Sequence, residues 1–416
     1  MLPREILERI AAAVGEDAVE EHAALEVDGT AFAVTLRPAD CEAVGRSLAA
    51  LGACGLGALV RGGGNRLGIG NVPSREGVLL STERLSGVDE FDPGEGVCHA
   101  RAGTRLAAAQ AIVCPHGWEF PLDAPGVTAT VGGVLAAAAV GPRALGHGRP
   151  RDLVLGLEVA LASGERTHCG GRVVKNVTGY DLNKLYTGSF GSLGVIEGAW
   201  LRLRPRPERT AVFEWSGSRL DGVGERGLAA ARRATARAVA TAVCVRGSER
   251  DVEFTVELAG DAASVERDAA WVEEHCDAQT AEPVAVDRMR ELQLRSPDPS
   301  GLRFRIDALP SRLQLALEQL CERCESVLVY PGLGLLYADV PLARADDGAV
   351  DSAFRFAAST ARAVGGGFVC ESGPAWAKRG RDVFGDVSAT LPLLEALKHR
   401  FDPGGILNPG RFAGGL

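Results

Sequence analysis

The first part of the chain alternates short apolar runs with one amphipathic segment. Residues 32–37 are rich in apolar and β-branched side chains and end before a proline, which predicts a strand. Residues 41–53 carry apolar positions at helical spacing, and Asp40 is placed to cap that helix. The apolar run at 57–60 leads into three glycines at 62–64. The pattern predicts a strand, a helix, a strand and a glycine loop, in that order.

Two further loops of small residues come later in the chain. Residues 128–133 hold threonines and glycines ahead of an alanine-rich helical pattern, which directs a helix N-terminus at that loop. Residues 153–165 indicate a buried strand that closes in a Ser-Gly turn. Residues 188–196, "GSFGSLGVI", lead into a β-rich segment. Small residues at such places let a backbone approach a ligand closely.

The pattern changes after Pro205 and Pro207. The predicted elements are then a strand at 210–215, a helix at 225–240, strands at 241–247 and 251–258, a helix at 262–276, a strand at 302–309, a helix at 310–324, strands at 326–330 and 333–340, a helix at 352–365 and a strand at 367–371. This is a βαββα(β) pattern repeated twice. It predicts one sheet covered by helices, ferredoxin-like in each half.

Composition narrows the class of protein. A net charge of −9 argues against a nucleic-acid partner, because phosphate binding needs a basic surface. The N-terminus lacks the apolar core of a signal peptide, and no apolar run is long enough to span a bilayer. Ten cysteines in such a chain predict reduced thiols and a cytoplasmic location.

One cysteine pair has metal-ligand spacing, Cys321 and Cys324, but a metal or iron–sulfur site needs about four ligands and the sequence has no second pair. We therefore predict that these thiols pack in a helix and that the chain holds no metal.

Glycine is 53 of the 416 residues, so short glycine motifs arise here by chance more often than usual. The stretch 61–70, "RGGGNRLGIG", fails both common phosphate-loop patterns. A P-loop requires Gly-Lys-Ser/Thr at its end, and none follows. A dinucleotide fingerprint beginning at Gly68 requires a third glycine where Pro73 stands. The backbone N–H groups of such a loop still suit an anion.

The three loops together, in this order and at these distances, resemble the FAD-binding domain shared by p-cresol methylhydroxylase and vanillyl-alcohol oxidase. The matching segments are Arg61 to Leu67, Thr130 to Gly133, Arg151-Asp152, Val154 to Glu158, Gly188 to Ile196, and the ending "FDPGGILNPGRF" with Asn408. The resemblance implies an α+β fold. It comprises a two-subdomain FAD-binding domain at 1–206, a cap domain with two ferredoxin-like halves at 207–395, and a segment at 396–416 that returns to the FAD domain.

The resemblance also implies the cofactor site. The cofactor-binding residues would be Arg61, Gly62, Gly63, Gly64, Asn65, Arg66, Leu67, Pro121, Thr130, Gly132, Gly133, Gly188, Gly194, Val195, Ile196 and Asn408. Amides at 62–65 and 130–133 would donate to the pyrophosphate of FAD, 194–196 would lie on the adenine side, and Asn408 near the isoalloxazine. Some relatives attach flavin through a histidine in the first loop; this loop has none, so we expect non-covalent FAD.

Catalytic relatives that oxidise 2-hydroxy acids carry H-x-G-D-G-N-x-H and G-E-H-G, whose histidines hold a metal or handle the hydroxyl proton. Here the first segment is "YPGLGLLY", with Tyr330 and Tyr337 in the two histidine positions. The second is "CESG", in which Glu371 remains and Ser372 replaces the histidine. Glu371, Tyr330 and Tyr337 are therefore only weak catalytic candidates.

An FAD scaffold without the catalytic histidines resembles the FAD-binding subunit of bacterial glycolate oxidase complexes, to which the stretches "GGRVVKNVTGYDL" and "FDPGGILNPGR" are also similar. The partners would then be a catalytic flavoprotein subunit and an iron–sulfur subunit. Two alternatives stay open at this stage. One is an autonomous FAD-dependent oxidoreductase of unknown substrate, and the other is a flavin-free structural subunit.

Overall fold

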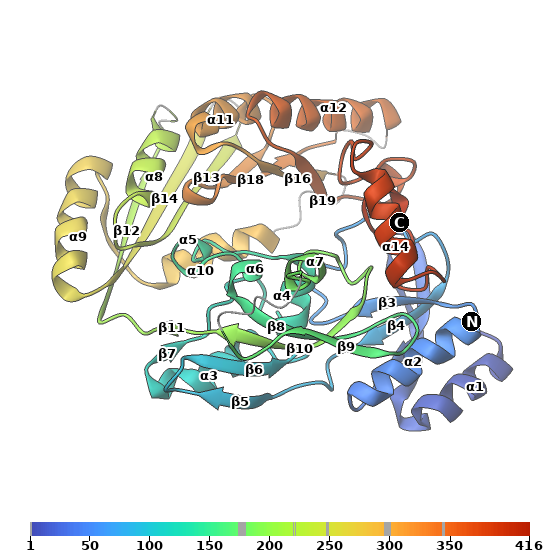
Figure 1. The fold of residues 1–416 in the computed structure, drawn as a ribbon. Helices are drawn as coiled ribbons and strands as arrows, with labels where there is room; N and C mark the ends of the chain where they lie inside the picture. The colour runs from blue at the N-terminus through green and yellow to red at the C-terminus, as the bar shows by residue number, and fades with distance from the viewer. Residues whose placement is uncertain are drawn as a thin grey trace. The chain divides into compact units, whose positions relative to one another are not determined.

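The computed structural model describes residues 2–173, 180–218, 220, 222–246, 249–294, 301–342 and 346–416. The chain forms two compact units, each assembled from segments that are separated in sequence (Figure 1). Unit 1 comprises Met1–Ala139, Arg149–Arg206 and Lys378–Leu416, and unit 2 comprises Val140–Gly148 and Pro207–Ala377. The domain bounds expected from the sequence differ from these units at 140–148, which belongs to unit 2, and at 378–395, which belongs to unit 1.

Unit 1 contains two main sheets. The first has the order β1 (Val19–Val27), β2 (Thr30–Leu36), β4 (Gly77–Ser81), β3 (Gly57–Arg61); the second has the order β5 (Val88–Asp92), β6 (Val97–Arg101), β10 (Val195–Arg202), β8 (Val154–Ala160), β9 (Arg166–Gly170). A small sheet pairs β11 (Arg204–Pro205) with β7 (Trp118–Glu119). Its helices are α1 (Arg4–Val14), α2 (Cys41–Ala53), α3 (Leu106–Val113), α4 (Val131–Ala137), α6 (Pro150–Leu153), α7 (Asn183–Tyr186) and α14 (Leu391–Phe401).

The predicted order of strand, helix, strand and glycine loop is present in β2, α2 and β3. Asp40 caps α2 as expected, because its side chain accepts a hydrogen bond from the Ala43 N–H at 2.7 Å. Strands β2 and β3 both pair with β4 in parallel, so the C-terminal ends of β3 and β4 lie side by side at the same end of the sheet. The first glycine loop begins at that end.

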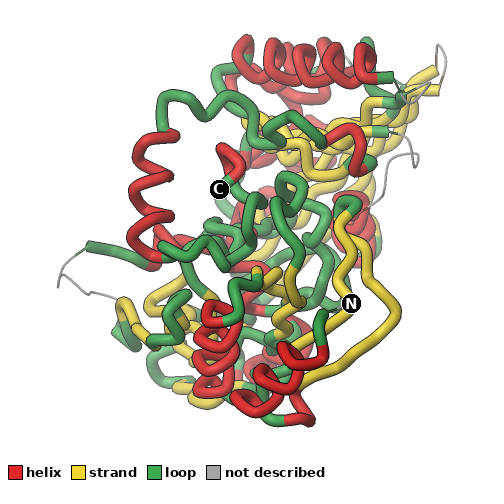
Figure 2. Tube along the Cα trace, turned by 90° about the vertical axis from the view of Figure 1, so that its right-hand side faces the viewer, coloured by secondary structure: helices red, strands yellow, loops and turns green. Residues whose placement is uncertain are grey.

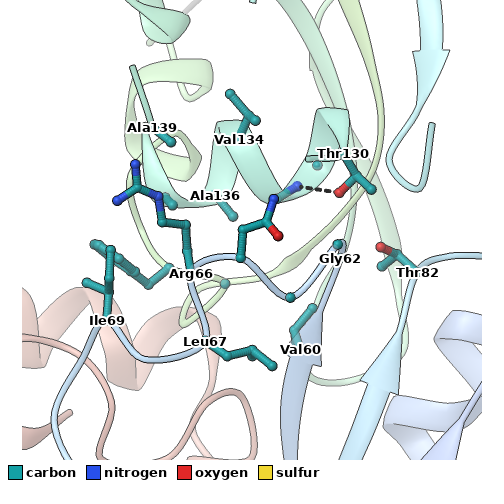
Figure 3. A pocket seen from close by; sticks show the side chains of 18 of the residues that line it. Val60, Gly62, Arg66, Leu67, Ile69, Thr82, Thr130, Val134, Ala136 and Ala139 are labelled. Carbon is teal, nitrogen blue, oxygen red and sulfur yellow. Dashed lines mark hydrogen bonds between the residues drawn. The ribbon is translucent and has the colours of Figure 1, made fainter. Parts of the chain in front are cut away.

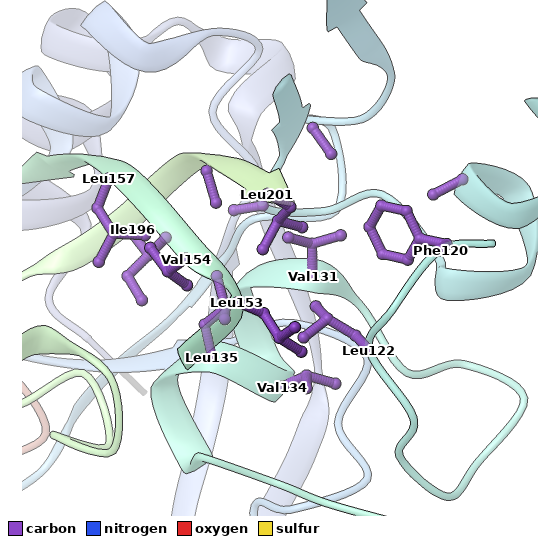
Figure 4. Packing of buried hydrophobic residues seen from close by; sticks show 14 of the residues in the cluster. Phe120, Leu122, Val131, Val134, Leu135, Leu153, Val154, Leu157, Ile196 and Leu201 are labelled. Atoms are coloured by element: carbon purple, nitrogen blue, oxygen red, sulfur yellow. The ribbon is translucent and has the colours of Figure 1, made fainter. Parts of the chain in front are cut away.

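Helix α4 packs on the five-stranded sheet and is held there by a continuous apolar core. Figure 4 shows Val131, Val134 and Leu135 of α4 among Leu153, Val154, Leu157, Ile196 and Leu201. Seven residues give α4 little stability of its own, so this packing fixes where the helix begins. The second glycine loop is thereby fixed as well.

Unit 2 is one eight-stranded sheet with helices. The strand order is β15 (Gln279–Ala281), β12 (Arg209–Gly217), β14 (Glu249–Gly260), β13 (Ala236–Arg246), β17 (Ser326–Tyr330), β18 (Leu335–Val340), β16 (Leu302–Asp307), β19 (Phe368–Ser372). The helices are α5 (Ala144–His147), α8 (Val223–Ala231), α9 (Ala262–Cys276), α10 (Val284–Glu291), α11 (Leu313–Cys321) and α12 (Asp347–Ala363), and α13 (Ala375–Lys378) ends at the boundary of the unit. Helices cover the sheet in both views (Figures 1 and 2).

Each half of this sheet has the ferredoxin-like strand order. Numbered within its own half, each set of four strands lies in the order 4-1-3-2, and the halves join where β13 pairs with β17. The two faces of this sheet pack against different helices, because successive side chains of a strand point to opposite faces. Val239 of β13 packs in one apolar cluster with residues of α8 and α9, whereas its neighbour Ala238 packs with residues of α10.

One predicted helix was wrong in its extent. The alanine-rich stretch 225–240 was expected to be helical throughout, but α8 ends at Ala231 and β13 begins at Ala236. Strand β13 lies in the middle of the sheet and pairs with both β14 and β17. Those ladder hydrogen bonds outweigh the helix propensity of alanine, which is a weak preference in tertiary context.

The sequence argued against a membrane-spanning segment and against a metal site, and two observations on the structure concern these two properties. No helix within the described ranges is long and apolar enough to cross a bilayer. Across the same ranges, no three His, Cys, Asp or Glu side chains gather where they would hold a metal ion. Cys321 and Cys324 are buried at the end of α11, and burial raises the pKa of the Cys321 thiol to about 11.

Candidate functional site

Unit 1 contains a pocket that is partly open to solvent, and its empty volume of about 940 Å³ includes that open space. Its lining consists of Leu59, Val60, Gly62, Gly63, Gly64, Asn65, Arg66, Leu67, Ile69, Thr82, Ala124, Pro125, Ala129, Thr130, Gly132, Gly133, Val134, Ala136, Ala137, Ala139, Phe190, Gly191, Gly194, Ile196, Asn408 and Arg411. Most of these residues come from the three loops of small residues and from the C-terminal segment, and the others come from β3, α4 and the segments near residues 82 and 124 (Figure 3). The lining contains two arginines and no carboxylate, so it suits a large, partly apolar anion.

The first and second loops contact each other directly, and this contact explains their glycines. A Cβ on Gly62 would lie 2.4 Å from Thr130 Oγ1, and a Cβ on Gly63 would lie 1.7 Å from the carbonyl oxygen of Thr128. Figure 3 shows Gly62 and Thr130 next to each other. Gly64 adopts a φ of +84°, which side chains disfavour. The triple glycine is therefore required by packing and by backbone conformation.

The two loops differ in the backbone donors that they leave for a ligand. Within the described part of the chain, the N–H groups of Gly63, Gly64 and Asn65 donate no hydrogen bond to the protein. At the start of α4, by contrast, the N–H of Val131 donates to Thr104 O at 2.9 Å.

The next two N–H groups of α4 are also engaged. Gly132 N donates to Ala102 O at 2.8 Å, and Gly133 N donates to Thr130 Oγ1 at 3.3 Å. The N–H groups of residues 131–133 therefore already have partners in unit 1, and donation from amides at 130–133 to the pyrophosphate stays a prediction. The first loop offers donors that the described protein does not use, while the second loop packs closely against it.

The third loop is tied to the first through Asn408. The side-chain amide of Asn408 donates to Phe190 O at 2.5 Å, and its oxygen accepts the Val60 N–H at 2.8 Å. Gly191 packs against this amide, because a Cβ there would lie 2.8 Å from Asn408 Nδ2. Asn408 itself has a φ of +45°, which asparagine tolerates better than most residues. Asn408 thus holds the pocket together as well as lining it.

A buried ion pair supports the same C-terminal segment. Lys398 donates to Asp402 Oδ2 at 2.6 Å, to Ser192 O at 2.9 Å and to Leu407 O at 2.8 Å. Burial lowers the pKa of Lys398, and its hydrogen bond to Asp402 opposes that effect. The pair fixes the residues next to Asn408 against the third loop.

A second buried charge lies directly behind the pocket on β10, next to the lining residue Ile196. Glu197 is fully buried and accepts a hydrogen bond from Arg166 Nε at 2.9 Å, but no described residue donates a hydrogen bond to its Oε1. Burial raises the pKa of Glu197, and the Arg166 guanidinium acts in the opposite direction. Glu197 does not line the pocket, so we expect its protonation to affect the stability of the fold and not the ligand directly.

Most of the residues predicted for the cofactor lie in this pocket. Twelve line it: Gly62, Gly63, Gly64, Asn65, Arg66, Leu67, Thr130, Gly132, Gly133, Gly194, Ile196 and Asn408. Four do not: Arg61, Pro121, Gly188 and Val195. Val195 is fully buried and its side chain points to the opposite face of the strand from that of Ile196, whereas Gly188 is bound to α4 through its N–H, which donates to Leu135 O at 3.0 Å. Their roles as FAD ligands stay predictions.

Sequence reasoning missed several lining residues, most notably Phe190 and Arg411. The only available signal for Arg411 was its place directly after the Asn-Pro-Gly of the C-terminal motif. Lys175 and Asn176, within the stretch "GGRVVKNVTGYDL", lie outside the described residues.

The weak catalytic candidates all lie in unit 2. Tyr330 and Tyr337 are buried in one apolar cluster, with their rings edge to face at a centroid distance of 5.8 Å. Glu371 is 6% exposed, and its Oε1 lies 3.4 Å from a guanidinium nitrogen of Arg305.

Comparison with known proteins decides what the pocket is for. Residues 32–170 match the family model described as the FAD binding domain. This part of the chain is similar to an FAD-binding domain. The glycine packing, the unused donors of the first loop and the lining without carboxylates all fit that cofactor. The expected cofactor is confirmed at the level of this domain.

The chain also resembles curated relatives over part of its length. It is 38% identical over 180 residues to D-lactate dehydrogenase of Archaeoglobus fulgidus, which is 43% of this chain and 40% of that protein. It is 39% identical over 133 residues to glycolate oxidase subunit GlcE of Escherichia coli, which is 32% of this chain and 38% of that protein. The chain thus covers less than half of the length of these relatives, which confirm the predicted resemblance to FAD-dependent oxidoreductases.

Solved structures resemble the whole chain. The structure of p-cresol methylhydroxylase with substrate bound has a TM-score of 0.74 and 15% identity, and the likeness covers 98% of this chain and 96% of that one. Alkyldihydroxyacetonephosphate synthase gives a TM-score of 0.70 at 13% identity, covering 98% of this chain and 85% of that one. At such identities the likeness concerns the fold alone, and it confirms the predicted fold class.

Proposed function

We propose that this chain is the FAD-binding subunit of a glycolate or related 2-hydroxy-acid oxidase (dehydrogenase) complex, and that it acts in electron transfer or in support of the catalytic subunit. When bound, FAD supplies the redox chemistry. The chain's own residues bind and orient it: the first loop donates its backbone N–H groups, and the second and third loops exclude water along the pocket wall. Relatives named as a D-lactate dehydrogenase and as a glycolate oxidase subunit support this proposal.

The observation that carries the subunit role is the state of the residues where hydroxy-acid oxidation would need a base. Tyr330 and Tyr337 are buried in an apolar cluster, and Glu371 is paired with Arg305. A general base must reach the substrate proton and have a pKa suited to accept it. None of these three side chains lines the pocket of unit 1. Substrate oxidation is therefore assigned to a catalytic flavoprotein partner, with an iron–sulfur subunit as a further partner.

Anaerobic mixing of the purified, FAD-loaded chain with glycolate or D-lactate tests this assignment. We expect the flavin absorbance to stay unchanged with either acid, and to bleach on addition of dithionite, which shows that the flavin is reducible. Bleaching by a hydroxy acid alone would favour the autonomous oxidoreductase and contradict the proposal. Purification of a tagged chain from its own cells is the second arm. It should bring down a second flavoprotein and an iron–sulfur protein in constant ratio.

A further inference from the structure

The hairpin between β1 and β2 carries a buried carboxylate at its tip. Asp28 and Gly29 form the two-residue turn, with φ values of +49° and +79°, as in a type I′ hairpin. The carboxylate of such a turn usually faces water, but the side chain of Asp28 is only 7% exposed. It accepts a hydrogen bond from Lys378 Nζ at 2.7 Å and another from Arg411 Nη1. A turn residue thus anchors two cations.

Those two cations are themselves buried, and they bind one short stretch of backbone. Lys378 is 1% exposed and Arg411 is 4% exposed. Arg411 donates to the carbonyl oxygens of residues 67, 69 and 71, at 2.8 Å for the last two, and Lys378 donates to that of residue 68. Four carbonyls of residues 67–71, which continue the first loop, are therefore held by two cations. We call Asp28, Lys378 and Arg411 the cation clasp.

The cation clasp binds carbonyl groups of the first loop and its continuation, and leaves backbone N–H groups of that loop available for a ligand. Each peptide unit has one donor and one acceptor, and a loop that binds an anion must turn its acceptors elsewhere. Here four of the carbonyl acceptors of residues 67–71 accept hydrogen bonds from the clasp, while the N–H groups of Gly63, Gly64 and Asn65 donate to no group in the described chain. Gly70 completes the fit, because a Cβ there would lie 2.8 Å from Arg411 O.

We propose that Asp28, Lys378 and Arg411 are positioning residues for FAD: they set the first loop in its anion-binding conformation before the cofactor arrives. The clasp acts through the backbone of the loop. A preset loop loses less conformational freedom on binding, so the clasp raises affinity without contributing the phosphate contacts itself. This inference rests on the FAD-binding domain and not on the identity of the substrate.

Conservative variants test the clasp, because deleting one member would leave a buried charge unpaired and risk the fold. Asp28→Asn keeps a sequence that favours the same turn and removes the anchor charge. Arg411→Lys keeps the charge but cannot span three carbonyls. For each folded variant we expect the Kd for FAD, measured by flavin fluorescence on the apoprotein, to rise roughly tenfold or more.

Arg75→Lys is the matched control. Arg75 also donates to two adjacent carbonyls of unit 1, those of Gly404 and Gly405, but it does not line the pocket. Its variant should bind FAD within about twofold of the parent. A Kd equally unchanged in Asp28→Asn and Arg411→Lys would overturn the proposal, since a merely structural role would lower the melting temperature without weakening FAD binding.

Hydrogen exchange of the unaltered protein provides a test that needs no variant, so misfolding of a variant cannot affect its result. In the apoprotein, a peptide covering residues 62–71 should already exchange slowly at Leu67, Ile69 and Asn71, whose N–H groups donate within the unit. Addition of FAD should add protection mainly at residues 63–65. A loop that exchanges freely throughout in the apoprotein and becomes protected only with FAD would refute the presetting. No substrate is present, so the result stands apart from the hydroxy-acid assignment.

Discussion

Gly62→Ala tests the packing of the first loop against the second. A Cβ at this position would lie 2.4 Å from Thr130 Oγ1, about 1 Å closer than ordinary van der Waals contact. The two loops must then move apart, and overpacking of this kind costs about 1–3 kcal/mol. Since Gly62 has no positive φ, backbone strain adds nothing to that figure. We expect a lower urea midpoint for the apoprotein and weaker FAD binding in a flavin titration.

Thr130→Ala should partly rescue the Gly62→Ala variant, because it removes the hydroxyl oxygen that the methyl group introduced at position 62 would overlap. Alone it should cost about 1 kcal/mol, since Thr130 caps α4. The double variant should be less destabilised than the two single variants added together, with a coupling of about 1–3 kcal/mol. Gly68→Ala is the control within the same loop, because a Cβ there meets nothing within 4 Å. Simple additivity in the double variant would refute the packing argument.

Three other substitutions have defined outcomes. Gly133→Val should abolish FAD binding, measured by flavin absorbance, because Gly133 lines the pocket and its Cβ would already lie 3.0 Å from Thr130 Oγ1; retained flavin would contradict the placement of the second loop. Asn408→Ala should cost about 1–3 kcal/mol in thermal unfolding, because it leaves Val60 N–H and Phe190 O without their partner; an unchanged melting temperature would argue against that role. Burial raises the pKa of Glu197 above its ordinary 4.5, so the folded state binds this proton more tightly and stability falls as the pH rises from 4.5 through the raised pKa. Glu197→Gln should remove that fall when melting is compared at about pH 5 and about pH 7, and an unchanged pH dependence would contradict the assignment.

The sequence was sufficient to predict the two repeated halves of the sheet in unit 2 and the three loops of small residues in unit 1. Glycine positions such as Gly62 and Gly133 are visible because only glycine satisfies their packing, so the pattern of residue types records the contact. The ferredoxin-like halves follow from the periodicity of their strands and helices. The strand at 236–240 was missed, because its alanines have a helix preference that the neighbouring strands override.

The electrostatic part of the site could not be predicted. Asp28 is 350 residues from Lys378 and 383 residues from Arg411, and each of the three has an ordinary local context. Only the folded chain shows that they meet at the backbone of residues 67–71. In the same way, no local pattern shows that Ala102 and Thr104 accept the first N–H groups of α4. Partners of backbone groups are decided by tertiary packing, which the sequence pattern does not specify.

Titration of the purified apoprotein with FAD is the measurement that tests the central claim most directly. The pocket of unit 1 should take up one FAD per chain without a covalent bond, giving flavin absorbance bands near about 375 and about 450 nm, and the cofactor should be released on denaturation. The Gly133→Val variant should take up none under the same conditions. A parent protein that stays colourless after reconstitution, or a variant that binds FAD as tightly as the parent, would contradict the account.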